Sequence, residues 1–361
     1  MKVKSQNSRI VVLTRYNQQF ASARVRFLQY ADLWRKAGRT VAVTILLDEK
    51  FKQSILSDKK FSLGLILHTA YCYLKRIGFV LFKIKRGDIV FIQLEILPMF
   101  PSILERYLAW RKIPFVIDFD DAFFDFYEKS NNKLVTMFLK NKFSNIVTMA
   151  NWNITGSAFL TEYAFKRTNR VTEIPTSVLM KDYAHHTATQ NNVFTIGWIG
   201  SPSTAKFIDD IAEVLIQFVE KTNSLLLLVG YEGRLLKNHP NITNETWNIS
   251  TEVPMLNQVD VGIMPLRNDG FSLGKCGFKL IQYMACGKPT ISTPLPANVN
   301  IDGGTGNLFA NNNAEWLSAL EQVFNNSKHF REVGIQNRTR VINHYSIEGN
   351  YAKYLDIFDI L

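Results

Sequence analysis

The chain has 361 residues, of which 47% are hydrophobic and 20% are charged, and its formal net charge is +11. This composition excludes a disordered or fibrous chain, and the length suffices for two globular domains, each with its own core. The three cysteines, Cys72, Cys276 and Cys286, are widely spaced without a metal-ligand pattern, so we expect reduced thiols in a cytosolic protein. We expect no secretion signal, because the first predicted strand already lies within residues 1–16, at 9–14.

The positive charge lies in the first half of the chain. Residues 1–180 hold 28 Lys and Arg against 14 Asp and Glu, whereas residues 181–361 hold 14 against 17. A basic half indicates an anionic partner. The basic residues are scattered, and no helix-turn-helix, zinc finger or aromatic RNA-binding strand accompanies them, which favours an anionic membrane surface over nucleic acid.

Strands and helices are predicted to alternate in two successive blocks. The first block has predicted strands at 9–14, 40–47, 88–93, 115–119, 152–156 and 172–174, and predicted helices at 22–37, 61–86, 101–111 and 133–150. A polar segment at 181–192 is typical of a linker. The second block has predicted strands at 194–199, 224–229, 259–264 and after Pro289, and predicted helices at 204–221 and 277–286. Such alternation predicts parallel sheets, and two of them predict a ligand cleft between two domains.

The segment 61–86, FSLGLILHTAYCYLKRIGFVLFKIKR, combines many apolar residues with a basic end. Its first uncharged run, 61–74, has 14 residues, which is too short to span a bilayer. Two interpretations stay open for this segment. It is either a basic amphipathic helix that lies in a membrane interface, or a buried helix between two strands with its lysines exposed at the edge.

Residues 259–294, VDVGIMPLRNDGFSLGKCGFKLIQYMACGKPTISTP, predict a βαβ unit with a polar, glycine-containing loop before its helix. Loops at the carboxyl ends of parallel strands bind ligands in open α/β sheets, and a helix start there favours an anion. Lys275, Lys279 and Gln282 are four and three residues apart, so we expect them to share one side of the segment. These side chains suit a diphosphate and sugar hydroxyls; the alternative is a solvated lysine face on an ordinary amphipathic helix.

Four segments resemble the GT-B glycosyltransferases of family 4, retaining enzymes that use nucleotide sugars in polysaccharide and glycolipid assembly. The segments are SARVRFLQYADLWRKAG at 22–38, FIQLEILP at 91–98 with FVIDFDDAFF at 115–124, TIGWIGSPSTAKF at 195–207, and DVGIMPL at 260–266 with GKCGFKLIQYMACGKPTIST at 274–293. The last is the most specific, and several match members that build bacterial surface polysaccharides. The resemblance implies an α/β fold of the GT-B type, with two Rossmann-like domains whose parallel sheets face each other across a cleft.

The domains implied by this resemblance are an N-terminal acceptor domain over 1–180 and a C-terminal nucleotide-sugar donor domain over 181–345. A C-terminal helix over 346–361 is expected to pack back toward the N-terminal domain. Oligomeric state is not implied by the family signature.

The resemblance also implies a donor site, with two departures from the family pattern. The family signature has two glutamates with seven residues between them, and Gly274 and Gln282 stand at their positions here. Gln282 is still expected to bond ribose hydroxyls, whereas Gly274 has no side chain to contact the donor sugar. Ser201 stands where an arginine is common, so neutralisation of the diphosphate is assigned to lysines and to the backbone amides of 200–203. The implied donor-binding residues are Gly200, Ser201, Lys206, Trp247, Lys275, Phe278, Lys279 and Gln282.

Two of these residues keep an alternative interpretation. Trp247 is expected either to pack on the nucleotide base or to belong to the core. Lys206 is either a phosphate ligand or a solvated helix residue.

In the N-terminal domain the resemblance implies catalytic roles for Glu95 and for Asp120, which replaces a histidine common in the family. A carboxylate there would orient the acceptor hydroxyl or stabilise an oxocarbenium-like centre, while the lysines stabilise the departing diphosphate. The alternative is that the carboxylates cap helices or pair with Arg24 and Arg26, which are otherwise expected to contact the diphosphate or an anionic acceptor. Asp118-x-Asp120 resembles a metal-binding motif, but GT-B enzymes generally bind donors without metal, so we expect no metal and no other cofactor.

These features predict a retaining glycosyltransferase that moves a sugar from a nucleotide-diphosphate sugar, with a UDP-sugar favoured, to a lipid-linked or saccharide acceptor. The expected setting is bacterial O-antigen (lipopolysaccharide), capsule or exopolysaccharide biosynthesis, by a cytoplasmic protein peripheral to the inner face of the plasma membrane. Two alternatives stay open. One is a non-catalytic nucleotide-sugar-binding scaffold, suggested by the loss of both glutamates, and the other is a nucleotide-sugar 2-epimerase on the same fold.

Overall fold

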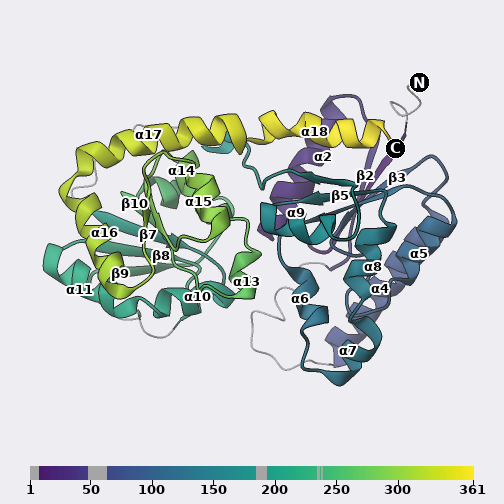
Figure 1. Cartoon of the computed structure of the whole chain (residues 1–361), viewed down its shortest axis with the longest axis horizontal. Helices are drawn as coiled ribbons and strands as arrows, with labels where there is room; N and C mark the ends of the chain where they lie inside the picture. Colours follow the sequence, from purple (N-terminus) through teal and green to yellow (C-terminus); the bar gives the residue numbers. More distant parts are fainter. Residues whose placement is uncertain (1–7, 48–62, 184–192, 234–235, 237–238) are drawn as a thin grey trace. The chain divides into compact units, whose positions relative to one another are not determined.

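The computed structural model describes residues 8–47, 63–183, 193–233, 236 and 239–361, which form two compact units. Unit 1 comprises Met1–Thr176 with Asn350–Leu361, and unit 2 comprises Ser177–Gly349. Each unit is built around a six-stranded parallel sheet (Figure 1). The α/β class with two Rossmann-like units is therefore confirmed. The division between the units falls at 176/177, whereas the sequence predicts 180/181.

The sheet of unit 1 has the strand order β2-β1-β3-β4-β5-β6. The strands are β1 (Ile10–Thr14), β2 (Val41–Ile45), β3 (Ile89–Gln93), β4 (Phe115–Phe119), β5 (Trp152–Thr155) and β6 (Val171–Glu173). The strands β1, β3 and β4 are buried along their whole length, as expected for apolar strands covered on both faces. The strands predicted in the first block are all present, because most residues in each are apolar or β-branched.

Helices of unit 1 connect these strands. The first connection runs through α1 (Ala21–Ala23), a π-helical segment (Arg24–Leu28) and α2 (Gln29–Lys36). The others are α4 (Leu63–Phe82), α5 (Ile103–Trp110), α6 (Phe123–Glu128), α7 (Lys133–Leu139), α8 (Lys142–Met149), α9 (Ala158–Phe165) and, at the C-terminal end, α18 (Ile347–Asp359).

Two predicted helices of unit 1 differ in extent from the observed ones. The helix predicted at 61–86 is α4, and residues 61–62 lie outside the described part of the chain. The single helix predicted at 133–150 is divided into α7 and α8, with Asn141 between them. Asparagine competes with the helix backbone for hydrogen bonds, which favours a break there. Asn132 begins α7 as its cap, with its side chain accepting the amide of Leu134 at 3.0 Å.

The sheet of unit 2 has the strand order β12-β11-β10-β7-β8-β9. The strands are β7 (Thr195–Ile199), β8 (Leu225–Val229), β9 (Ile242–Glu245), β10 (Val261–Met264), β11 (Thr290–Ser292) and β12 (Leu308–Phe309). The helices are a 3-10 turn (Met180–Tyr183), α10 (Pro202–Asp209), α11 (Ala212–Thr222), α12 (Glu252–Asn257), α13 (Gly270–Leu273), α14 (Phe278–Ala285), α15 (Pro296–Asp302), α16 (Asn313–Asn325) and α17 (Ser327–His344). Most of the predicted linker, 184–192, lies outside the described residues.

A close fit between Gly262 and Tyr283 fixes α14 on the sheet of unit 2. A Cβ atom added to Gly262 of β10 would lie 2.2 Å from the ring of Tyr283 on α14. The fully buried Tyr283 hydroxyl accepts the amide of Ile199 at 2.9 Å and donates to the carbonyl of Ile263 at 3.4 Å. Burial raises the pKa of Tyr283, so the hydroxyl stays a donor. The glycine therefore sets the distance between helix and sheet in the predicted βαβ unit.

A buried ion pair ties the C-terminal helix to unit 1. Arg26 is fully buried and its guanidinium binds both carboxylate oxygens of Asp118, at 2.5 and 3.0 Å. The hydroxyl of Tyr354, on α18, donates to the same carboxylate at 3.1 Å. Burial raises the pKa of Asp118 to about 6, so at pH 7 the carboxylate is ionised opposite the arginine. Farther along α18, the ring of Phe358 packs on Trp34 with centroids 5.1 Å apart.

We predict that Arg26→Met destabilises the protein by about 3–5 kcal/mol, because it leaves the Asp118 carboxylate buried without its cation. Urea unfolding followed by tryptophan fluorescence measures the change. The control is Arg35→Met, since Arg35 pairs with Asp32 on an exposed surface at 2.8 Å and should contribute less than about 1 kcal/mol. Equal unfolding curves for Arg26→Met and the wild type would contradict the prediction.

Candidate functional site

Three lysines of unit 2 gather beside the loop between β10 and α14. The ammonium of Lys275 lies 4.1 Å from the centroid of the Phe271 ring, and that of Lys206 lies 5.8 Å from the same centroid. Lys279 donates to the hydroxyl of Thr204 at 3.1 Å, which places it against α10, the helix that carries Lys206. The fold therefore brings together three ammonium groups that are separated by up to 73 positions, at the carboxyl edge of the sheet.

Lys279 lies against the core of unit 2, and its pKa is lowered. Its ammonium lies 4.6 Å from the centroid of the Trp198 ring, on the core side of α10. Burial, and then the charge of Lys275, lower the pKa of Lys279 to about 7. The side chain still has some exposed surface, so an anion can reach it. A bound diphosphate would supply the missing counter-charge and favour the protonated lysine.

The helical spacing predicted for these lysines is wrong for Lys275. The helix α14 begins only at Phe278, after Gly277 in the left-handed conformation with φ +60°. A Cβ atom at Gly277 would meet Ile301 at 2.2 Å, so the turn requires glycine. Lys275 lies in the loop before that turn and reaches Phe271 from there. Gly274 ends α13, and Phe278 is partly buried against the core of unit 2.

The backbone amides predicted to bind phosphate are partly committed to the fold. The amide of Gly200 donates to the carbonyl of Val229 at 2.9 Å, and the amide of Ser201 donates to the hydroxyl of Thr204 at 3.2 Å. The sheet and the start of α10 take up these two donors, which corrects the phosphate role predicted for them. Gly200 nevertheless has a steric role, since a Cβ atom there would lie 2.3 Å from the Trp198 ring beside Lys279.

Gln282 and Trp247 meet at a carboxylate that the sequence does not predict. The amide nitrogen of Gln282 donates to Glu252 at 2.8 Å and to the hydroxyl of Tyr183 at 3.2 Å. The indole nitrogen of Trp247 donates to the other oxygen of Glu252 at 2.7 Å. Glu252 and Gln282 are both buried, and Trp247 packs partly on the core. A carboxylate thus stands beside the position of the missing second glutamate, supplied by the first turn of α12. The sequence predicts neither this helix nor a role for its acid.

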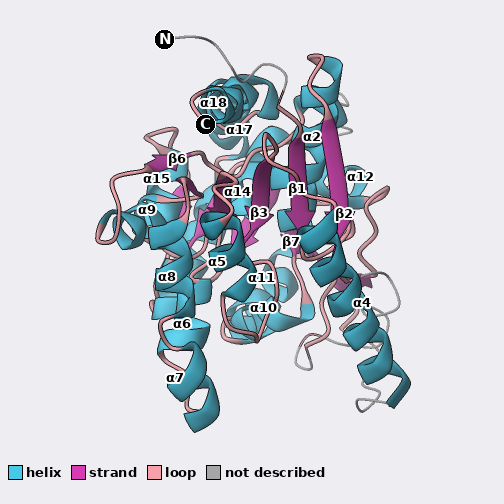
Figure 2. Cartoon of the chain, turned by 90° about the vertical axis from the view of Figure 1, so that its right-hand side faces the viewer, coloured by secondary structure: helices cyan, strands magenta, loops and turns pink. Residues whose placement is uncertain are grey.

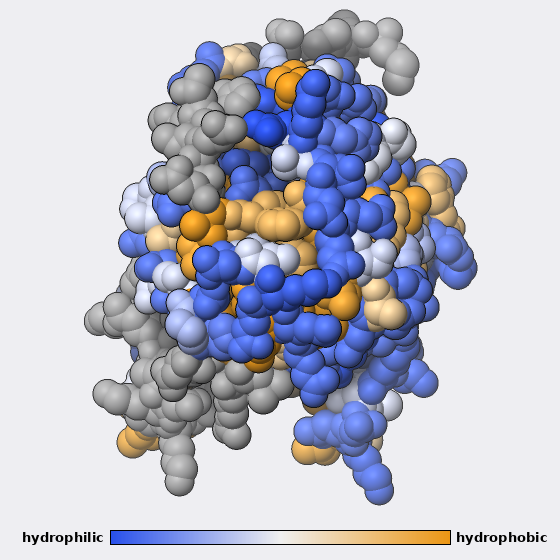
Figure 3. Space-filling model, turned by 90° about the vertical axis from the view of Figure 1, so that its left-hand side faces the viewer, coloured by the Kyte–Doolittle hydropathy of each residue, from blue (hydrophilic) through white to orange (hydrophobic). Residues whose placement is uncertain are grey.

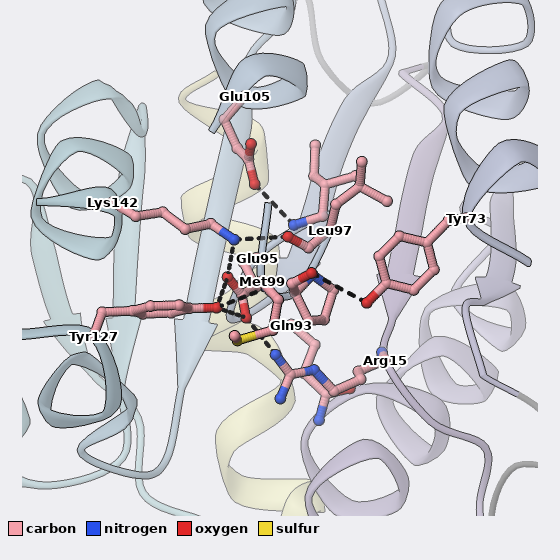
Figure 4. Close-up of polar contacts among 11 residues, drawn as sticks. Arg15, Tyr73, Gln93, Glu95, Leu97, Met99, Glu105, Tyr127 and Lys142 are labelled. Carbon is pink, nitrogen blue, oxygen red and sulfur yellow. Dashed lines mark hydrogen bonds and ion pairs between the residues drawn. The ribbon is translucent and has the colours of Figure 1, made fainter. Parts of the chain in front are cut away.

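In unit 1, Glu95 lies at the centre of a buried polar cluster (Figure 4). Arg15 and Lys142 both form ion pairs with its carboxylate, and the hydroxyl of Tyr127 donates to it at 2.9 Å. The Glu95 side chain has no exposed surface. Residues of unit 1 therefore bind both oxygens of Glu95, which favours a structural role over the predicted catalytic one. The sequence predicts Arg24 and Arg26 as its partners in that role, whereas the observed partners are Arg15 and Lys142.

The loop that carries Glu95 is held in an unusual backbone conformation. Leu94 and Met99 have φ values of +63° and +61°, which L residues with side chains rarely adopt. Side chains from other elements fix this loop: Lys142 donates to the carbonyl of Leu97 at 2.6 Å, and Glu105 accepts the amide of Ile96 at 2.8 Å. Such over-determined strain concentrates at functional sites, here at the carboxyl end of β3.

Asp120 has the more accessible position of the two predicted catalytic carboxylates. It follows β4 and is half-buried, and the hydroxyl of Ser22 donates to it at 2.9 Å. The amide nitrogen of Gln93 donates in turn to Ser22 at 3.1 Å, while the amide oxygen of Gln93 accepts the amide of Arg15 at 2.8 Å. Ser22 and Gln93, for which the sequence predicts no role, therefore orient Asp120 from the ends of neighbouring elements.

The two predicted acceptor arginines are buried. Arg26 has no exposed surface and binds Asp118, and it also donates to the carbonyl of Ile174 at 3.0 Å. Arg24 is 6% exposed and donates to the carbonyl of Gln18 at 3.4 Å. The predicted contact with an acceptor is thus wrong for Arg26, for which the structural alternative holds, and Arg24 offers little surface for it.

The Asp118-x-Asp120 motif does not present two carboxylates to one metal ion, because Asp118 is bound by Arg26. Within the described part of the chain, no group of three or more His, Cys, Asp or Glu has an arrangement that would hold a metal ion.

Unit 2 is similar in sequence to a known family. Residues 192–326 match the family model described as glycosyl transferases group 1. This match covers a little over a third of the chain and shows that unit 2 is similar to a group 1 glycosyl transferase domain. No curated protein matches the chain in sequence. The matched domain contains the three lysines, Glu252, Trp247 and Gln282.

Solved glycosyltransferase structures share the fold over almost the entire chain. A glycosyltransferase from Rickettsia africae has a TM-score of 0.69 at 14% identity, with 98% of each chain covered. Sucrose-phosphate synthase from Thermosynechococcus elongatus has a TM-score of 0.72 at 12% identity, also with 98% of each chain covered. HepE from Anabaena, solved in complex with UDP, has a TM-score of 0.69 at 12% identity, with 98% of this chain and 100% of that chain covered. The GT-B fold is confirmed.

We predict that the affinity of the lysine cluster for a diphosphate, measured with UDP as the probe, decreases as the pH rises from 7 to 9. Above a pKa of about 7 the free Lys279 is neutral, so binding an anion must take up a proton, and affinity falls by up to about tenfold per pH unit. Isothermal titration calorimetry in buffers of different ionisation enthalpy measures both the affinity and the proton uptake. Lys279→Arg keeps its charge and should lose the pH dependence; an unchanged slope in this variant would contradict the assignment.

Proposed function

We propose that this glycosyltransferase uses a nucleotide-diphosphate sugar, with UDP as the nucleotide, and retains the configuration of the transferred sugar. The observation that carries the proposal is the convergence of Lys206, Lys275 and Lys279 on one edge of unit 2. Three ammonium groups that gather at one edge of a sheet suit a diphosphate better than a neutral ligand. HepE, of the same fold, is described in complex with UDP and with UDP-glucose, which supports the choice of nucleotide.

In the proposed reaction the bond between the anomeric carbon and the diphosphate oxygen breaks, and its electron pair leaves with the diphosphate. The acceptor oxygen bonds to the same face of the anomeric carbon, and its proton passes to the departing diphosphate. The lysines stabilise the charge that develops on the leaving group. Lys279 contributes most, because it is the least solvated of the three. The nucleotide sugar is the substrate, and the proposal assigns no resident metal or cofactor.

Glu252, Gln282 and Trp247 form the part of the proposed donor site that replaces the family's glutamates. The Glu252 carboxylate orients both the Gln282 amide and the Trp247 indole. A buried carboxylate with two neutral donors keeps strong acceptor capacity for a ribose hydroxyl. We propose that the nucleoside half of the donor packs near Trp247.

Unit 1 is proposed to bind the acceptor, with Asp120 as the residue that orients its hydroxyl. Asp120 is half-buried, follows β4 directly and is itself held by Ser22. We further propose that the acceptor is a lipid-linked or saccharide intermediate of bacterial surface polysaccharide, at the inner face of the plasma membrane. The excess of basic residues in 1–180 supports an anionic membrane as the setting.

We predict that, among UDP-, GDP-, TDP- and ADP-sugars, the UDP class raises the melting temperature in a thermal-shift screen. A ligand at one hundred times its Kd stabilises the folded state by about 2.7 kcal/mol. Lys279→Ala should abolish the shift. Lys221→Ala is the matched control, since Lys221 pairs with Glu321 on an exposed surface of unit 2 and should keep the full shift. A full increase in melting temperature in the Lys279→Ala variant would contradict the phosphate-binding role proposed for Lys279.

We predict opposite effects for the two carboxylates of unit 1. Asp120→Asn should lower kcat for transfer about 10²-fold or more at an unchanged melting temperature, since asparagine still accepts the hydrogen bond of Ser22. Glu95→Gln should instead destabilise the protein by about 3 kcal/mol or more, because it leaves Arg15 and Lys142 buried without a carboxylate. Transfer to a polyprenyl-diphosphate glycan and thermal unfolding give the two readouts. A wild-type kcat in the Asp120→Asn variant would contradict the catalytic role proposed for Asp120.

The scaffold alternative makes a different prediction from the same samples. A scaffold binds UDP but neither hydrolyses a UDP-sugar nor transfers its sugar to a polyprenyl-diphosphate glycan. Binding without turnover would therefore replace the proposed activity with a nucleotide-sugar-binding role.

A further inference from the structure

The helix α4 carries a stripe of exposed apolar side chains along its first half. Leu63, Leu67, Tyr71 and Leu74 recur at helical spacing, and each has more than half of its surface exposed. The second half of α4 is anchored on unit 1, where the buried Arg76 donates to the carbonyls at the ends of β1 and β2, at 2.9 and 3.1 Å. The exposed stripe therefore belongs to a helix that the sheet holds firmly.

The helix α7 carries a second apolar stripe. Leu134, Met137 and Phe138 lie on one face at spacings of three and four residues, and their exposed fractions are 64%, 66% and 67%. Val135 and Leu139 are buried and fix the opposite face of the helix. A short helix with three large apolar side chains in water is unfavourable by itself, which indicates that another apolar phase covers it.

Both stripes lie at the carboxyl edge of the sheet of unit 1. The helix α4 begins on the path that follows β2, and α6 and α7 follow β4. Because all strands of this sheet are parallel, the ends of β2 and β4 share one edge. In Figures 1 and 2, the start of α4 and the helix α7 both project from the lower end of unit 1. Met99 and Phe100, in the loop after β3 at that edge, are about half exposed as well.

The charges near the stripes are positive. Residues 63–82 and 129–149 contain no Asp or Glu, whereas Lys75, Lys133 and Lys140 are exposed. By comparison, the face that Figure 3 shows is mainly hydrophilic, with hydrophobic residues across its middle and in smaller patches elsewhere. Exposed apolar side chains on helices that carry cations and no acidic residues complement an anionic lipid surface.

We propose that the stripes of α4 and α7 insert together into an anionic phospholipid bilayer, so that the carboxyl edge of the unit 1 sheet faces the lipid. This inference rests on the proposed lipid-linked acceptor and names the surface that meets its membrane. The helix α4 has the length and hydropathy of a membrane span, and 22% of its most apolar window is buried inside the protein. Its anchorage through Arg76 favours insertion of one side over crossing, since crossing would detach a buried arginine from β1 and β2. Two separate projecting helices suit a fluid bilayer better than the flat, continuous patch of a dimer interface.

The test is flotation of the full-length protein with phosphatidylglycerol–phosphatidylcholine vesicles and with phosphatidylcholine vesicles. We expect the wild type to float with the anionic vesicles and to bind the neutral ones more weakly. Met137→Ser with Phe138→Ser on α7, and Leu67→Ser with Leu74→Ser on α4, should each lower the partition coefficient about tenfold or more, because each pair removes two inserted apolar side chains. Phe165→Ser is the matched control, since Phe165 is 55% exposed but ends α9 at the opposite edge of the sheet; it should float like the wild type.

The thermal shift with UDP shows that each variant is folded and separates this inference from the proposed function. Flotation that depends on both helices supports docking even if no donor is turned over. Three results would each contradict membrane docking. The first is a wild type that does not float although it transfers sugar to a soluble acceptor, and the second is an α7 pair variant that floats normally. The third is a dimer, detected by light scattering, that dissociates in the same variants. The last result would assign the stripes to a second copy of the chain.

Discussion

Arg26 and Asp118 form a fully buried ion pair, and distant segments of unit 1 meet at it. The guanidinium comes from the π-helical segment of the first connection, the carboxylate from the end of β4, and a third partner, Tyr354, from α18. Two residues after Asp118, the chain reaches Asp120 at the edge of the sheet. Because the ion pair fixes the end of β4, it also fixes the direction in which Asp120 leaves the sheet. Arg26, for which the sequence predicts a ligand contact, thus serves to position Asp120, the carboxylate that we propose orients the acceptor.

Burial separates the roles of three carboxylates that look alike in the sequence. Asp118, Glu95 and Asp120 all follow apolar strands, and each has a cation or hydroxyl as a partner. Asp118 and Glu95 are enclosed with arginine or lysine, so their charge is consumed within unit 1. Asp120 accepts a hydrogen bond from the Ser22 hydroxyl and keeps part of its surface exposed, so a ligand can reach its carboxylate.

Most strands of both units could be predicted from the sequence, because most of their residues are apolar or β-branched. The exceptions are β9, whose residues Ile242–Glu245 are mostly exposed and carry no apolar pattern, and β12, which has only the two residues Leu308–Phe309. The sequence predicts Lys275 on the same helix as Lys279, but the φ of +60° at Gly277 delays the helix start, so Lys275 lies in the preceding loop. The contacts of Gln282 with Glu252 and of Lys279 with Thr204 join residues 30 and 75 positions apart, and no local spacing encodes such pairs.

The fit of Gly262 against Tyr283 links the sheet of unit 2 to the proposed phosphate site, because Tyr283 and Lys279 are both on α14. Tyr283 is one turn beyond Lys279 on α14, and the absence of a side chain at Gly262 allows its ring to lie against β10. A methyl group at position 262 would push the ring outward and tilt α14, and Lys279 would move away from Thr204 and Trp198 with it. The proposed donor binding is therefore sensitive to a residue outside the lysine cluster, and a map of substrate contacts alone would leave that residue out.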